Sequence, residues 1–107
     1  MIEGLAVTEE IVTEEGTFKG CLIRKRQCER LMDAPSGNHR YECTIEIYKS
    51  VPSFKDEEPP VRVKSISKRF TFQVKPQEED LTEEQIYNAI YHHYSKQFKL
   101  AFQKIRA

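Results

Sequence analysis

The sequence holds 107 residues with a mass of 12.6 kDa, enough for one domain around one hydrophobic core. Seventeen basic residues balance seventeen acidic ones, and this zero net charge argues against a general binder of nucleic acids or acidic membrane surfaces. Hydrophobic residues make up 38% of the chain and charged residues 32%, which excludes a disordered tail. We expect a single domain over 1–107, β-rich over 1–75 and helical over 82–105.

The start of the chain and the cysteines predict where the protein resides. Residues 1–7 have neither the basic region nor the apolar stretch of a signal peptide, and no apolar run of about 18 residues occurs. Cys21, Cys28 and Cys43 are odd in number and irregularly spaced, which fits buried thiols better than a disulfide framework. We expect a cytoplasmic protein without membrane contact and with three reduced cysteines.

The first forty residues predict a β-hairpin followed by a loop. Residues 5–13 are rich in valine, isoleucine and threonine, and 14–16 end in a glycine that suits a turn. The return strand runs from 17 to about 28 and leaves the core where three basic residues follow one another at 24–26. Residues 33–38 have the composition of a loop.

Two further strands are expected on either side of a proline-containing loop. Residues 40–50 alternate apolar and polar side chains, which is typical of a strand with one buried face. The expected buried positions are Tyr41, Cys43, Ile45 and Ile47. Three prolines in 51–60 argue against a helix or a central strand there. Residues 61–75 form the next predicted strand, with a bulge near Ser65 because the parity of the apolar positions changes.

The last segment predicts one long amphipathic helix over 82–105. Thr82 and Gln85 have the spacing of a capping box, which marks its start. At 100° per residue one arc collects the apolar side chains of Tyr87, Ile90, Tyr91, Tyr94, Phe98, Ala101, Phe102 and Ile105. A helix of about 24 residues is roughly 36 Å long, more than strands of five or six residues can cover. Its aromatic end is therefore expected to contact another chain.

These elements predict an α+β fold. The expected arrangement is an antiparallel four- to five-stranded sheet, or a small barrel, covered on one face by the C-terminal helix. The charges support antiparallel neighbours, because the acidic residues 1–20 are followed by the basic residues 21–40 and then by the acidic residues 41–60. Opposite charges across a strand pair stabilise a sheet.

No pattern in the sequence points to catalysis, a metal or a cofactor. His92 and His93 are adjacent, so on a helix they point about 100° apart and cannot share a metal as an i, i+4 pair does. The cysteines lack the paired spacing of a zinc site. No serine, cysteine and histidine are marked as neighbours for nucleophilic catalysis. We expect no enzyme activity, no small-molecule substrate, no metal and no cofactor.

A basic stripe supports an alternative function. The cations that could contact phosphates are Arg24, Lys25, Arg26, Lys68 and Arg69. Phe70 and Phe72 follow them, as in sheets that stack single-stranded bases. These two rings share parity with the core positions Ile66 and Val74, however, so a packed core with a solvated charged face is the preferred interpretation.

Several segments together resemble small virion or tail-region proteins that phages and prophages of Gram-positive hosts encode. The segments are the strand Tyr41–Ser50, the following acidic loop with Phe54, the strand end Phe70–Phe72 and the helix start Leu81–Tyr87. The resemblance covers roughly residues 40–95. It implies a non-enzymatic building block of a symmetric assembly, located in the host cytoplasm or the virion.

The preferred functional hypothesis is an assembly protein that binds a protein partner or itself. Phe54 and Lys55 in the loop, and Phe98, Phe102 and Ile105 at the helix end, are the candidate contact residues. The alternative is a small nucleic-acid-binding or inhibitory accessory protein that uses the basic stripe. A small enzyme ranks third.

Overall fold

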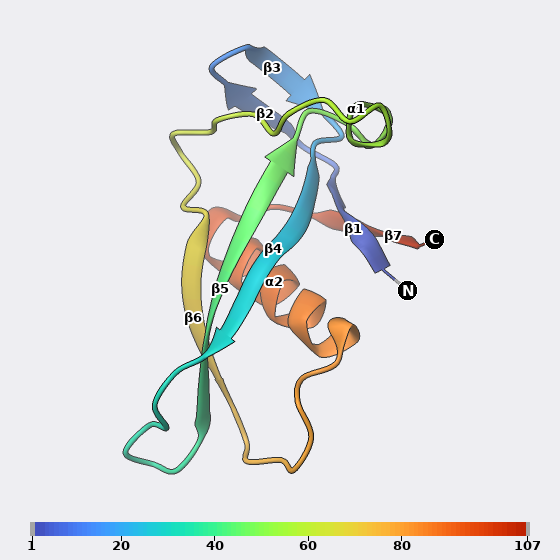
Figure 1. Ribbon diagram of the computed structural model, residues 1–107. Helices are drawn as coiled ribbons and strands as arrows, with labels where there is room; N and C mark the ends of the chain where they lie inside the picture. The colour runs from blue at the N-terminus through green and yellow to red at the C-terminus, as the bar shows by residue number, and fades with distance from the viewer. Residues whose placement is uncertain (1, 107) are drawn as a thin grey trace.

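Five antiparallel strands, a small second sheet and one long helix make up the computed structural model, which describes residues 2–106 (Figure 1). The elements are β1 (Ile2–Val7), β2 (Glu10–Thr13), β3 (Gly16–Lys19), β4 (Leu22–Arg30), β5 (His39–Tyr48), α1 (Val51–Lys55), β6 (Arg69–Val74), α2 (Glu83–Phe98) and β7 (Phe102–Arg106). The main sheet has the strand order β6-β5-β4-β1-β7. The predicted α+β class and antiparallel sheet are confirmed.

The main sheet is open, so the alternative of a small barrel is wrong. A barrel requires its two end strands to pair, but β6 and β7 stand at opposite ends of the strand order. The helix α2 packs on the face that a barrel would enclose (Figure 1). Two sheet edges therefore remain, one at β6 and one at β7.

The predicted hairpin exists, but it forms a sheet of its own. Thr13 pairs with Gly16 across a two-residue turn, and Gly16 has a φ of 133°, which a side chain would disfavour. The two long strands expected on either side are each interrupted, at residues 8–9 and 20–21. Gly20 has a φ of 82° and allows the bend that separates β3 from β4.

The strand expected at 40–50 is confirmed as β5, the central partner of β4 and β6. Its predicted inward residues Tyr41, Cys43, Ile45 and Ile47 are all buried. The expected charge pairing also occurs, because Arg24 of β4 lies opposite Glu46 of β5.

The segment after β5 differs from the prediction in two places. Residues 51–55 form the short helix α1, because Pro52 lies in the first turn, where a missing N–H loses no bond, and Ser50 caps the N–H of Ser53 at 3.1 Å. The expected strand over 61–75 is shorter, since only β6 is a strand and residues 64–65 form a turn. The change of parity reflects this turn, so the bulge near Ser65 is wrong.

The end of the chain is also different. The Thr82–Gln85 capping box is confirmed, but α2 ends at Phe98 because Lys99 adopts a left-handed conformation with φ 54°. Residues 102–106 form β7, antiparallel to β1. A C-terminal helix over 82–105 is therefore wrong, and Ala101, Phe102 and Ile105 do not extend its apolar face. The 16 residues of α2 span about 24 Å, which the sheet can cover.

The core lies between α2 and the inner face of the sheet. Ile86, Tyr87, Ile90 and Tyr94 are the buried residues of the helix. The hydroxyl of Tyr94 donates to the carbonyl of Ser67 at 2.6 Å, and the backbone N–H of Lys25 donates to the hydroxyl of Tyr87 at 3.1 Å. Tyr91, expected on the packed face, is 37% exposed. Within residues 2–106 no helix is long and apolar enough to cross a membrane.

Candidate functional site

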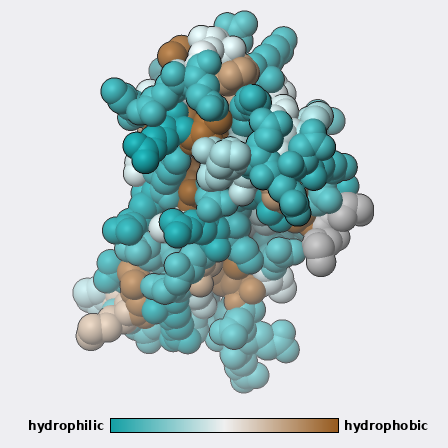
Figure 2. All heavy atoms as spheres, turned by 45° about the horizontal axis from the view of Figure 1, so that its top comes forward, coloured by the Kyte–Doolittle hydropathy of each residue, from teal (hydrophilic) through white to brown (hydrophobic). Residues whose placement is uncertain are grey.

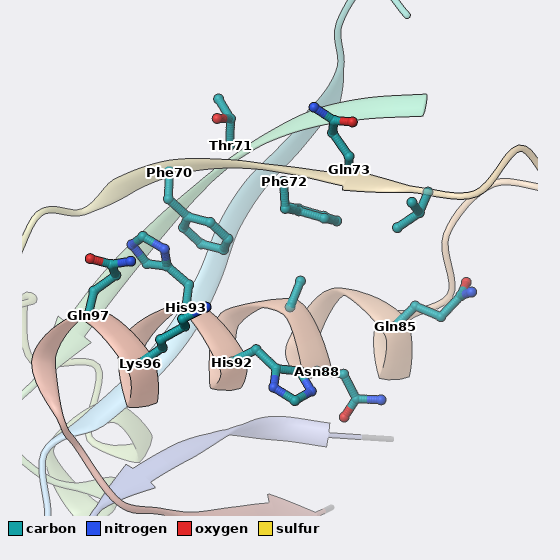
Figure 3. A pocket seen from close by; sticks show the side chains of 12 residues that line it. Phe70, Thr71, Phe72, Gln73, Gln85, Asn88, His92, His93, Lys96 and Gln97 are labelled. Carbon is teal, nitrogen blue, oxygen red and sulfur yellow. The ribbon is translucent and has the colours of Figure 1, made fainter. Parts of the chain in front are cut away.

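A groove of about 610 Å³ runs between the edge strand β6 and the helix α2, and we call it the β6–α2 groove (Figure 3). Phe70 and Phe72 point from β6 toward the helix, and their rings form the floor of the groove on the strand side. Ala89 and His93 of α2 line the other side. The side chains of the intervening strand residues point away from the helix (Figure 3).

The aromatic floor of the groove is packed into the core and is therefore preorganised. The imidazole of His93 stacks on Phe70 with ring centroids 4.3 Å apart and planes at 8°. Phe70 meets the buried ring of Tyr94 edge-on at 5.6 Å, and Phe72 stacks on Tyr41 at 5.6 Å. Burial lowers the pKa of His93 below its ordinary value of 6.5, so the imidazole is neutral at pH 7. The floor thus presents uncharged ring surface.

The rim of the groove is polar, and its formal charge is positive. Gln85, Asn88 and Gln97 of α2 supply amides, and Lys96 supplies an ammonium group. No carboxylate belongs to the described residues that line the groove. An apolar floor with a few polar groups around it is the usual make-up of a binding site.

The predicted contact residues Phe54 and Lys55 lie on α1, away from this groove. The guanidinium of Arg24 lies 4.0 Å from the centre of the Phe54 ring, and Tyr48 meets the same ring edge-on at 5.1 Å. Phe54 is half-buried by these contacts, whereas Lys55 is exposed. The docking role of both residues stays a prediction.

The second predicted contact set is divided between two elements. Phe98, at the end of α2, stacks on Tyr94 at 5.5 Å. Phe102 belongs to β7 and packs on Tyr91 at 5.6 Å, while Ile105 lies opposite Gly4 in the pairing with β1. These side chains are half-buried and do not form the single helix face that the sequence suggested.

The cations of the predicted basic stripe all have acceptors within the chain. Arg24 donates to the carbonyl of Glu3 at 2.6 Å, and Lys68 donates to the carbonyl of Val61 at 3.1 Å. The remaining ion pairs join Lys25 to Glu83 at 3.8 Å, Arg26 to Glu46 at 3.7 Å and Arg69 to Glu42 at 3.7 Å. Three of the five cations thus have a carboxylate within 4 Å, which partly offsets the positive charge of the stripe. The face in Figure 2 is hydrophilic apart from small apolar patches.

The cysteines and histidines do not form a metal site in the part of the chain that the structure describes. All three cysteines are free, and Cys28 lies opposite Cys43 in the β4–β5 pair. The interaction between the two thiols lowers the pKa of Cys28, while the same interaction and burial raise the pKa of Cys43.

Comparison with protein-family models, with curated proteins and with solved structures found no match. The resemblance to phage virion and tail proteins therefore stays a prediction.

Sequence reasoning placed Phe70 and Phe72 on the inner face of a strand, which is where they lie, but it did not find the groove. Ala89, His93 and Lys96 fall within the helix expected over 82–105, but nothing in the sequence marked them as a site. Their function as a site depends on β6 being an edge strand, and a six-residue strand at an edge has the same alternating pattern as one in the middle.

Proposed function

We propose that the protein is a non-enzymatic binding module that makes protein–protein contacts through the β6–α2 groove. The observation that carries the proposal is the position of a preorganised apolar groove directly beside an edge strand. Edge strands and helix grooves are the two elements that proteins most often use to hold a segment of another chain. The half-buried ring of Phe72 and the methyl group of Ala89 are the apolar anchoring surface, and the buried ring of Phe70 supports them from below.

The length of the groove favours a polypeptide over a compact metabolite. Residues 70–74 line it without a gap, and this stretch of strand is about 13 Å long. On the helix side the lining runs from Gln85 to Gln97, about 18 Å of α2. A slot of this length matches four to six residues of extended chain.

The other candidate surfaces are less suited to this function. Phe54 already packs on Tyr48 beneath Arg24, so its ring is engaged within the molecule. The basic residues near 24–26 and 68–69 are paired with carboxylates or carbonyls, which reduces their attraction for phosphates. A role in a virion or tail assembly is compatible with such a module, and the resemblance of residues 40–95 is its support.

A peptide-display selection tests the proposal. A random twelve-residue library is selected on the wild-type protein, and each recovered peptide is then tested on two variants of α2. Ala89→Trp fills the groove, whereas Tyr91→Trp changes a partly exposed ring on the opposite flank of the helix and leaves the groove open. We expect peptides that bind the wild type and Tyr91→Trp but lose binding to Ala89→Trp. A selection that yields no peptide with this pattern contradicts the proposal.

A further inference from the structure

The hydrogen bonds of β6 show which of its backbone groups are free. The N–H of Ile45 donates to the carbonyl of Lys68 at 2.9 Å, and this pair continues the β5–β6 register. In an antiparallel ladder hydrogen-bonded pairs alternate with non-bonded ones. Residues 70, 72 and 74 therefore direct their N–H and C=O groups to β5. Residues 69, 71 and 73 direct theirs to the open edge.

The outward groups of Thr71 and Gln73 are the available ones. At Arg69 the hydroxyl of Ser67 already binds both groups, accepting from the N–H at 3.4 Å and donating to the carbonyl at 3.0 Å. Thr71 and Gln73 thus offer two N–H donors and two carbonyl acceptors along the groove. Within β6 neither a lysine nor a proline blocks this edge, because Lys68 comes before the strand and Lys75 and Pro76 come after it.

We propose that the β6–α2 groove binds an extended acidic peptide segment of another protein, which adds a strand to the edge of β6 through Thr71 and Gln73. This inference rests on the proposed function and specifies its partner. Added strands gain affinity from main-chain hydrogen bonds and specificity from pockets for alternate side chains. Here one parity of the peptide faces α2, where the rings of Phe70 and Phe72 and the methyl group of Ala89 form the pocket.

Charge complementarity makes the segment acidic. The lining carries the ammonium of Lys96 and no carboxylate among its described residues, and the imidazole of His93 is neutral. A glutamate or aspartate of the parity that faces the helix meets Lys96 at the edge of an apolar floor.

A second copy of this chain is a poorer occupant of the same edge. Two copies of β6 pair fully only when Thr71 of one lies opposite Gln73 of the other, because these residues carry the free groups. That antiparallel register places Arg69 of each copy opposite Lys75 of the other. Like charges directly opposite each other destabilise a strand pair. An acidic peptide meets the same cations favourably.

The experiment uses one peptide selected on the wild-type protein, synthesised with a fluorescent label and titrated by fluorescence polarisation. Two further forms carry N-methyl groups on alternate amides, one form for each parity. Thr71→Pro removes one outward N–H without touching the bonds to β5, and Thr71→Val is the matched control that keeps it. Lys96→Glu reverses the charge at the rim. Thermal unfolding of each variant checks that it folds.

Strand addition predicts a pattern that other binding modes do not produce. The peptide form with N-methyl groups on the amides that face β6 binds about tenfold more weakly or worse, and so does the unmethylated peptide on Thr71→Pro. The form methylated on the other amides, and the unmethylated peptide on Thr71→Val, bind as tightly as the unmethylated peptide binds the wild type. The selected sequences carry an acidic residue at the helix-facing position that meets Lys96, and selection on Lys96→Glu yields a basic residue there instead. The N-methylated peptides keep the test valid if Thr71→Pro does not fold.

Each contrary result overturns a defined part of the inference. Binding that Ala89→Trp abolishes, but that neither N-methylated form alters, leaves the proposed function intact and overturns strand addition. Neutral or basic consensus sequences overturn the acidic partner. A wild-type dimer that Thr71→Pro converts to a monomer identifies a second copy as the occupant and overturns the peptide. Peptides insensitive to Ala89→Trp overturn the proposed function itself.

Discussion

The two flanks of α2 meet the sheet in different ways. On the β7 flank the helix and the strand are joined by contacts, since Glu84 accepts from Lys104 at 3.5 Å and from Arg106 at 3.1 Å. Tyr91 also packs on Phe102. On the β6 flank the helix contacts the strand through His93 and Tyr94 on Phe70, and the β6–α2 groove opens beside these contacts (Figure 3).

The same helix therefore covers the sheet edge at β7 and leaves the edge at β6 open. On the β7 flank the charges of Lys104 and Arg106 also make the edge a poor template for another strand. On the β6 flank Thr71 and Gln73, whose backbone groups face the open edge, carry uncharged side chains. A closed flank contributes to stability, whereas an open flank keeps solvent-exposed apolar surface that a partner can cover.

The largest effect is expected at Tyr94, which is fully buried and supports both flanks. Its ring contacts Phe70 on the groove side and Phe98 at the end of α2. Tyr94→Ala should lower the free energy of unfolding by about 3–5 kcal/mol, the range for truncating a core aromatic. Tyr94→Phe is the control, because it removes only the bond to Ser67 and should lose about 0.5–1.5 kcal/mol. Denaturant unfolding measures both, and similar losses would contradict this account.

Adding atoms inside the packed sheet and adding them in the groove should have different consequences. A Cβ at Gly4 would lie 2.8 Å from the backbone carbonyl oxygen of Ile23 and 2.8 Å from a methyl carbon of Leu22. Gly4→Ala should therefore destabilise the protein by about 1–3 kcal/mol through overpacking of β1 against β4. Ala89→Leu adds more atoms, but into the groove, and should change stability by less than about 0.5 kcal/mol. Equal losses in thermal or chemical unfolding would show that the groove flank is closed too.

A pH titration should detect the imidazole on the groove flank. The pKa of His93 is lowered by burial, so the unfolded chain binds this proton more readily than the folded protein. The free energy of unfolding should fall as the pH drops through 6.5 toward the folded pKa. His93→Gln should remove this part of the slope between about pH 7 and pH 5.5, as measured by denaturant unfolding. A slope that is unchanged in the variant would mean that His93 titrates freely.

The smallest effect is expected at the ion pairs on the β7 flank. Arg106 and Lys104 lower the pKa of Glu84 below 4.5, so their contribution is present above pH 4.5 and is lost as the pH falls through the folded pKa. Because these side chains are exposed, Glu84→Gln should lower the melting temperature only slightly, and added salt should abolish the difference. A large fall in the melting temperature that added salt does not reduce would contradict this expectation and would mean that these ion pairs are important for stability.

Local patterns predicted much of this fold because the physics behind them is local. The alternation over residues 40–50 identified β5 and its buried face, and the spacing of Thr82 and Gln85 identified the start of α2. Both depend on side chains a few positions apart. Pro52 misled for the same reason, since a proline excludes a helix interior but suits a first turn.

The strand β7 could not be predicted from the local sequence pattern of residues 99–106. Helical periodicity continues through Phe102 and Ile105, yet Lys99 turns the chain and the backbone groups of β7 pair with β1, almost a hundred residues earlier. Pairing at such a distance overrides a modest helical preference, because the packing and hydrogen bonds of the sheet contribute more than propensity does.

By itself the sequence determined the fold class, the inward faces of β5 and α2, and the side chains of Phe70 and Phe72 that form the groove floor. Only the tertiary structure decided that β6 is an edge, that a groove opens between it and α2, and that Lys96 lies beside the opening. The reason is physical. Side-chain alternation records which face of a strand is buried, whereas the order of strands in a sheet depends on contacts between segments far apart in the chain.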